Sequence, residues 1–267
     1  MNNKEKGWLV KLMRLGFVAN GVVYITIGIL AVQAAFGAGG QTSGTQGALS
    51  TIASEPFGQF LLGLVGVGLV GLTIWYVIRG ISDPDNAGDD MSGMVKRIGY
   101  VVAGLGYGVL AYSAFRILTT ASGGGGNQAA DWTATLMQQT YGIWLVGITG
   151  LIIVGVGVYH LYKAYQTKFR RKLKVHEMNA TETKWGIRAG RLGLAARAVI
   201  FGIIGTFLIQ AAMQADPQQA GGVGKALQTL AGQSYGPWLL GIVSLGLIAY
   251  GLYSAVVLAR YRRIQFG

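Results

Sequence analysis

The residues that could do chemistry in this chain are a few polar side chains set within long apolar stretches. Gln33, Arg116 and Gln210 each follow another arginine by nineteen residues. In a helix this is about 28 Å, which predicts the three side chains near one edge of a bilayer's hydrocarbon core. A ring of two amides and one guanidinium could form the mouth of an anion path. The favoured alternative is an outward-facing, interfacial position, because the ring points roughly opposite the small-residue seam described below.

A second polar set comprises Asn20, Ala103 and Arg197, six residues after the same arginines. Thirteen residues separate it from the first set, a rotation of about 220° around a helix. The two sets therefore cannot line one continuous pore, which counts against a simple polar channel.

Other reactive groups are sparse. His160 could be a proton relay or a haem ligand, but His176 is the only other histidine, so a position at the level of the lipid headgroups is favoured. Glu55, Asp131 and Asp216 stand alone, one per loop, and the chain has no cysteine. We therefore predict no catalytic residue, no metal site and no cofactor, and expect that the protein is not an enzyme.

The composition indicates the elements that position these residues. Apolar residues make up 52% of the chain and charged residues only 12%, which is typical of a membrane protein. Six stretches approach the length of about 20 residues that a spanning helix needs. They are residues 15–36, 57–78, 98–115, 141–162, 198–213 and 235–259. The fifth reaches full length only if Arg197 extends its side chain to the interface.

These spans belong to a unit that is repeated three times. Two anchors recur in register and open the first and second span of each copy: Arg14-Leu15-Gly16, Arg97-Ile98-Gly99 and Arg191-Leu192-Gly193, then Phe57-Gly58, Tyr141-Gly142 and Tyr235-Gly236. The repeats are expected at 14–81, 97–165 and 191–259, separated by cytoplasmic joints at 82–96 and 166–190 and flanked by termini at 1–13 and 260–267.

An even number of spans per copy makes the three repeats parallel. We predict an all-helical integral membrane protein whose six transmembrane helices form a pseudo-threefold bundle, and a linear row of helix pairs is the alternative. Each outer loop also holds a short amphipathic segment. It is expected to lie flat at the outer interface or to tuck between the helix pairs, and a plug over a central path is the less favoured possibility.

Small residues seven apart form a seam on the first helix of each repeat. Its main members are Gly21 and Gly28, Gly104 and Ala111, and Ala198 and Gly205. The second helices carry a similar face at Gly66 and Thr73, Gly150 and Gly157, and Ser244 and Gly251. Missing side chains let backbones approach closely, so these faces are predicted to pack helix against helix.

The net charge of +12 follows from the predicted topology. Twenty of the twenty-two basic residues fall on one side of the spans, which by the positive-inside rule places both termini in the cytoplasm. Arg14, Arg97 and Arg191 are expected to be interfacial anchors. Contact with anionic lipid headgroups is favoured over nucleic acid, for which we predict no binding.

With its three Arg-x-Gly elements and three Phe-Gly or Tyr-Gly elements, the chain resembles the bacterial membrane proteins catalogued as domain of unknown function 1206. The resemblance implies six helices in the bacterial inner (plasma) membrane and supplies no activity. Two hypotheses follow. The favoured one is a scaffold or accessory subunit with a membrane-protein partner, and the alternative is a transporter or channel for ions or small solutes along the pseudo-threefold axis.

Overall fold

The computed structural model describes residues 3–37, 39–83, 88–120, 128–167, 169–170 and 173–262. Within them six helices are long and apolar enough to cross a membrane. The long helices are α1 (Asn3–Ala35), α3 (Gly58–Ile81), α4 (Met91–Thr120), α6 (Gly142–Gln166), α7 (Ala180–Gln214) and α9 (Gly236–Leu252), which continues as the π-helical η4 (Tyr253–Leu258) and α10 (Ala259–Tyr261). The shorter elements are α2 (Thr45–Ser54), α5 (Gln128–Met137), η2 (Val175–Glu177), η3 (Pro217–Gln219) and α8 (Val223–Ala231). The predicted fold class is confirmed.

Both predicted joints between repeats are shorter in the structure than in the sequence-based prediction, because the helices after them begin early. Helix α4 begins at Met91, and α7 begins at Ala180 behind a capping box. In this box Glu182 N donates to Asn179 Oδ1 over 2.7 Å, and Asn179 N donates to Glu182 Oε2 over 2.9 Å. A prediction from the length of the apolar stretches does not include these first turns, because their residues are polar. Parts of the predicted termini and joints, residues 1–2, 84–87, 168, 171–172 and 263–267, lie outside the described residues.

The second anchor of each repeat is a tight turn between a short helix and the long helix that follows. A side chain at Gly58, Gly142 or Gly236 would overlap a carbonyl oxygen at the end of the preceding short helix. The backbone N–H of each glycine also closes the turn, with N···O distances of 2.7, 2.9 and 2.7 Å to Glu55, Gln139 and Gln233. Glycine recurs here because only a hydrogen side chain fits.

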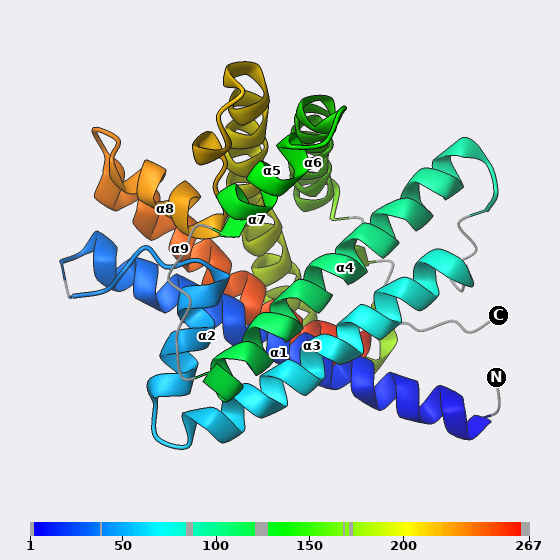
Figure 1. Ribbon diagram of the computed structural model, residues 1–267. Helices are drawn as coiled ribbons and strands as arrows, with labels where there is room; N and C mark the ends of the chain where they lie inside the picture. The colour runs from blue at the N-terminus through cyan, green and yellow to red at the C-terminus, as the bar shows by residue number, and fades with distance from the viewer. Residues whose placement is uncertain are drawn as a thin grey trace.

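The long helices form three antiparallel pairs, and each pair joins two repeats. The second helix of one repeat packs against the first helix of the next: α3 on α4, α6 on α7, and, closing the cycle, α9 on α1. Figure 1 shows that the three pairs run in different directions and cross near the middle of the molecule. The cyclic pairing therefore follows a threefold pattern, although the pairs are not parallel to one another.

The small-residue seams lie at these pair interfaces. A Cβ atom added to Gly21 would lie 2.6 Å from the carbonyl oxygen of Gly251, and one added to Gly28 would lie 2.8 Å from that of Ser244. In the same way the Cβ position of Gly205 lies 2.7 Å from the Gly150 carbonyl oxygen.

The remaining seam members occupy equivalent places. The Cβ position of Gly157 lies 3.0 Å from the Ala198 carbonyl oxygen, and that of Gly104 lies 3.2 Å from the Thr73 carbonyl oxygen. Ala111 is buried on α4. Each first-helix seam thus meets the small-residue face of the preceding repeat's second helix, at backbone contact distance.

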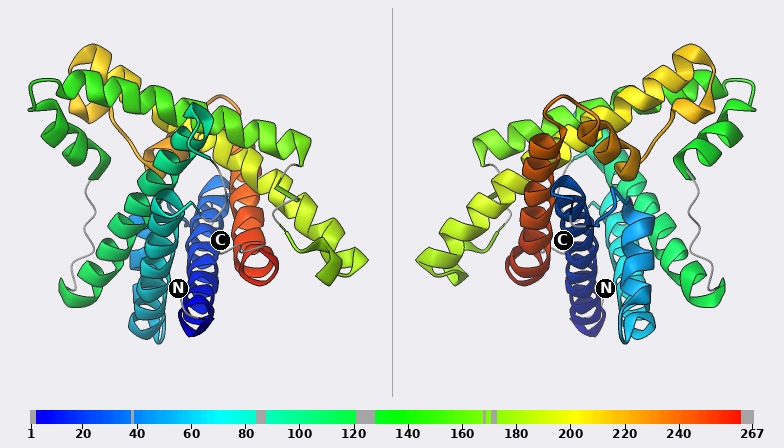
Figure 2. Two further views of the ribbon diagram at one scale, coloured as in Figure 1. Left: turned by 90° about the vertical axis from the view of Figure 1, so that its right-hand side faces the viewer. Right: turned by 90° about the vertical axis from the view of Figure 1, so that its left-hand side faces the viewer.

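The two helices within a repeat also pack together in repeats 1 and 3, but not in repeat 2. Helix α1 contacts α3 and α7 contacts α9, whereas α4 and α6 make no comparable contact between their described residues. In both views of Figure 2 the α6–α7 pair runs at a steep angle to α1, α3 and α4. The arrangement lies between the two sequence-based alternatives, because the pairing is cyclic but the ring is open at one place.

Two larger side chains explain the opening. In repeat 1 the Cβ position of Gly68 lies 2.7 Å from Ala19 Cβ, and in repeat 3 that of Gly246 lies 2.5 Å from Ala196 Cβ. The equivalent residues of repeat 2 are Val102 and Ile152, each 59% exposed. A valine facing an isoleucine cannot reproduce an alanine–glycine contact, so α4 and α6 stay apart.

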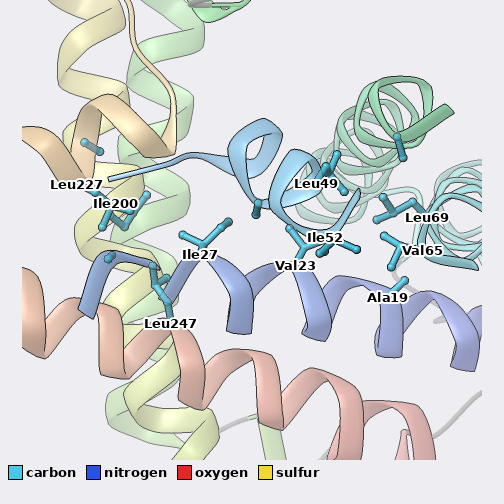
Figure 3. Close-up of a cluster of buried hydrophobic side chains, with 14 of the residues drawn as sticks. Ala19, Val23, Ile27, Leu49, Ile52, Val65, Leu69, Ile200, Leu227 and Leu247 are labelled. Carbon is cyan, nitrogen blue, oxygen red and sulfur yellow. The ribbon is translucent and has the colours of Figure 1, made fainter. Parts of the chain in front are cut away.

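The short helices do not share one arrangement. Helices α2 and α8 tuck between the long helices, and Ala48, Leu49, Ala226 and Leu227 are fully buried. Figure 3 shows Leu49 and Leu227 within the same apolar core as residues of α1 and α3. Helix α5 instead lies on α6 and η3. Tucking was one of the two placements expected from the sequence, and only α2 and α8 adopt it.

Candidate functional site

Aromatic rings converge where the three helix pairs cross. Tyr24 on α1, Tyr107 on α4 and Phe201 on α7 occupy the same place in their repeats, ten residues after the opening arginine. Within each helix pair, this ring packs against a ring on the partner helix, which is the second helix of the preceding repeat. The ring centroids are 4.8 Å apart for Tyr24 and Tyr250, 5.4 Å for Tyr107 and Tyr76, and 5.4 Å for Phe201 and His160.

Arg197 lies among these rings. Its Nη1 donates a hydrogen bond to the hydroxyl of Tyr250 over 2.5 Å. The guanidinium carbon also lies 4.5 Å from the ring centre of Tyr250, 4.9 Å from Phe201 and 5.4 Å from Tyr24. Rings at this range attract a cation through their negative faces. We call Arg197 and the six rings around it the central cluster: Tyr24, Tyr76, Tyr107, His160, Phe201 and Tyr250.

The positive charge of Arg197 has no carboxylate partner among the described residues. The ion pairs found there join Arg97 to Asp89, Lys174 and His176 to Glu177, and Arg260 to Glu182. Two buried nitrogens of the central cluster, Arg197 Nε and His160 Nδ1, have no hydrogen-bond partner within the described part of the chain. A buried donor without a partner carries a large desolvation cost, so the cluster is an electrostatically incomplete site.

At the equivalent positions of the α1–α9 interface, two buried polar side chains hydrogen-bond to each other. Asn20 and Ser254 occupy the places of Arg197 and His160 at the α1–α9 interface. Asn20 Nδ2 donates to Ser254 Oγ over 3.1 Å, and Ser254 Oγ donates to the Phe17 carbonyl oxygen over 2.9 Å. These buried polar groups satisfy one another, whereas Arg197 and His160 do not.

Replacing Ser254 with alanine should therefore destabilise the protein. The change leaves the Asn20 amide buried without its partner, and we expect a loss of about 1–3 kcal/mol. The thermal unfolding midpoint in mild detergent would reveal it. Thr206→Ala is the matched control, because the Thr206 hydroxyl is exposed and donates to Gly202 O of its own helix. Equal midpoints for the two variants would contradict the prediction.

The residues proposed from sequence as a polar ring lie on three different helices. Gln33, Arg116 and Gln210 are all exposed, on α1, α4 and α7 respectively. Exposure fits both an interfacial position and an open mouth, so the polar ring stays a prediction.

The three predicted basic anchors differ in their surroundings. Arg14 and Arg191 are exposed. Arg97 caps the end of α3, because its Nε donates to Gly80 O and its Nη2 to Ile81 O, both over 2.9 Å. This contact also holds α4 against α3.

Sequence reasoning missed the central cluster because it placed Arg197 at the interface. In the structure its guanidinium turns inward, and α7 reaches its length because it begins at Ala180. One signal was present in the sequence: Tyr24, Tyr107 and Phe201 recur beside the seam, and Arg197 lies one helical turn before Phe201. His160 was expected at headgroup level, and it lies against Phe201 within the cluster.

Comparison with known proteins agrees with the threefold organisation. The family described as Domain of Unknown Function (DUF1206) matches at residues 15–83, 98–166 and 192–262. The uncharacterized protein YxxB of Bacillus subtilis (strain 168) is 36% identical over 254 residues, which cover 95% of this chain and 92% of the relative. No solved structure matches significantly. The three tandem copies and the shared length show that this chain is a multi-pass membrane protein that belongs to the DUF1206 family.

Proposed function

We propose that this protein is a non-enzymatic accessory subunit or scaffold of the bacterial plasma membrane, and that it receives a transmembrane helix of a partner protein between α4 and α6. The observation that carries the proposal is the open interface of repeat 2. We call its exposed faces the open edge, formed by Gly99 and Val102 on α4 and by Ile152 and Gly155 on α6.

The glycines of the open edge have packed equivalents elsewhere. A Cβ atom on Gly16, which corresponds to Gly99, would lie 2.6 Å from Gly68 O, and one on Gly71, which corresponds to Gly155, would lie 2.6 Å from Leu12 O. At Gly99 and Gly155 a Cβ atom meets no other described atom within 4 Å.

This edge continues the ring of interfaces already present in the protein. Small residues favour contact with another helix, because the exposed backbone allows close packing that flexible lipid chains do not match. Val102 and Ile152 keep α4 and α6 apart, so the opening suits an added helix better than closure of the ring. The occupant that fits is one apolar helix without charged residues in its centre.

The orientation follows from the charges. The basic residues favour cytoplasmic termini, with anionic lipid headgroups along the same face. A path along the axis is less well supported. Leu49 and Leu227 are fully buried in the apolar core, Arg197 lies on the ring of Tyr250, and the three polar ring residues are exposed.

Photo-crosslinking in native membranes tests the proposal. A benzoylphenylalanine at Ile152 should form one adduct of defined mass, mapped by mass spectrometry to a spanning segment of the partner. The same group at Ile242, an exposed position on α9, should not form it.

A matched pair of glycine variants decides whether the edge itself is responsible. Gly99→Leu fills the open edge and should abolish the adduct, whereas Gly202→Leu should leave it intact. At both positions a Cβ has no neighbour within 4 Å beyond the nearby residues of its own helix, so the added side chain starts on an open face. Adducts with lipid alone, or an adduct that survives Gly99→Leu, would refute the docking of a helix here.

A further inference from the structure

The central cluster holds a charge that the described residues do not neutralise. An arginine within a spanning segment costs at least about 2.5–3.5 kcal/mol, and such residues mark functional sites. Arg197 offsets part of this cost through Tyr250 and the surrounding rings. Phenol hydroxyls and ring faces stabilise a cation without cancelling its charge, so the site remains positive.

The unused donors of the cluster come from two neighbouring helices. Arg197 Nε on α7 and His160 Nδ1 on α6 are both buried and both lack a hydrogen-bond partner within the described residues. The imidazole packs on Phe201, one helical turn beyond Arg197, with ring centres 5.4 Å apart, and the Arg197 guanidinium carbon lies 4.9 Å from the centre of the same ring. A guanidinium N–H and an imidazole N–H that share this ring form a donor set for an oxyanion.

The equivalent positions of repeat 1 do not share this incompleteness. At the equivalent interface Asn20 and Ser254 bond to each other and need no third group. In repeat 2 the corresponding first-helix residue is Ala103, opposite Tyr76, so neither of these two positions carries a charge. At the α6–α7 interface the equivalent positions hold a charge and two buried nitrogens without a hydrogen-bond partner among the described residues.

The central cluster includes residues of the two helices that border the open interface of repeat 2. Tyr107 on α4 and His160 on α6 belong to the cluster, and these two helices are the ones that do not pack together. Arg197, His160 and Tyr107 are partly exposed although they face the middle of the molecule. Arg197 also lies six residues, or about 9 Å, from the exposed Arg191, which is within reach of a lipid headgroup near the interface.

We propose that Arg197 and His160 bind one phosphate-type oxyanion, carried by an anionic phospholipid or free in solution, which reaches the central cluster between α4 and α6. The oxyanion accepts from Arg197 Nε and His160 Nδ1 and supplies the missing negative charge. Binding of the oxyanion uses the same gap between α4 and α6, but it does not require the partner helix proposed above.

The experiment measures retained ligand and thermal stability together. Delipidated protein in detergent is titrated with phosphatidylglycerol, with phosphatidylcholine and, separately, with inorganic phosphate against chloride. Native mass spectrometry counts bound lipid, and the unfolding midpoint reports binding of either ligand. The variants are Arg197→Gln and the control Arg188→Gln, which removes the same charge from an exposed position on the same helix.

We expect wild type and Arg188→Gln to retain one phosphatidylglycerol, and Arg197→Gln to bind it about tenfold more weakly, the effect of one lost charge-assisted hydrogen bond. If inorganic phosphate raises the midpoint of wild type but not of Arg197→Gln, and the two lipids behave alike, the ligand is the free ion. Equal behaviour of wild type and Arg197→Gln with every probe overturns the proposal.

Two further variants keep the test decisive if Arg197→Gln does not fold. Arg197→Lys retains the charge without the planar donor edge, and His160→Gln retains Arg197 while removing the imidazole. Each should weaken binding of the same probe, and wild-type binding in both would refute the assigned donors.

Discussion

Replacing Gly205 with alanine should lower the stability of the whole protein by about 3 kcal/mol, through overpacking of the α6–α7 interface. The added Cβ would lie 2.6 Å from Val154 Cγ2, 2.7 Å from Gly150 O and 2.9 Å from Val154 N. Two of these three atoms belong to the backbone of α6, which cannot rotate away. The helices must therefore separate, and the dispersion contacts of the tightest pair are lost.

The matched control lies three residues away on the same helix. A Cβ at Gly202 meets no other described atom within 4 Å, and alanine has the higher helix propensity. Gly202→Ala should therefore be neutral or stabilising by up to about 1 kcal/mol. The thermal unfolding midpoint in one detergent should fall for Gly205→Ala and stay the same or rise for Gly202→Ala. Similar midpoints would mean that the seam does not pack at backbone distance.

Much of this fold could be predicted from sequence because three copies of one unit repeat the same constraints. Six apolar stretches predicted six spanning helices, and the recurring Gly58, Gly142 and Gly236 marked turns that only glycine can make. The sequence period did not predict which helix each small-residue face packs against. A small-residue face predicts a close neighbour but does not say whether that neighbour belongs to the same repeat or to the next one.

The site was harder to predict because it depends on departures from the repeat. Arg197 differs from Asn20 and Ala103 at its position, and its inward orientation comes from rings on α1, α7 and α9 that converge only in three dimensions. An isolated arginine near the end of an apolar stretch looks like an interfacial residue. In the structure α7 begins at Ala180, so Arg197 lies well inside the helix and not at its end.

One substitution should separate the two helices of repeat 1 as those of repeat 2 are separated. Gly68→Ile gives α3 the isoleucine that α6 has at the equivalent position, Ile152. A Cβ at Gly68 would already lie 2.7 Å from Ala19 Cβ and 3.0 Å from Leu15 O. The larger side chain should force α1 from α3 and cost about 3–5 kcal/mol, the range of severe overpacking in a core. Loss of the monodisperse peak in size-exclusion chromatography would report it.

The reverse change should close the ring. Val102→Ala with Ile152→Gly restores the alanine–glycine contact of the other repeats and lets α4 approach α6. The chain has no cysteine, so a pair placed at Gly99 and Val156 can report the approach without background. The equivalent pairs already touch, since a Cβ on Gly16 would lie 2.6 Å from Leu72 Cγ and one on Gly193 would lie 2.5 Å from Tyr250 Cβ. A disulfide needs Cα atoms within about 7 Å, so oxidation should cross-link the cysteines only in the Ala–Gly background. Cross-linking in both backgrounds would show that Val102 and Ile152 do not hold the edge open, because their bulk would then be no barrier to contact.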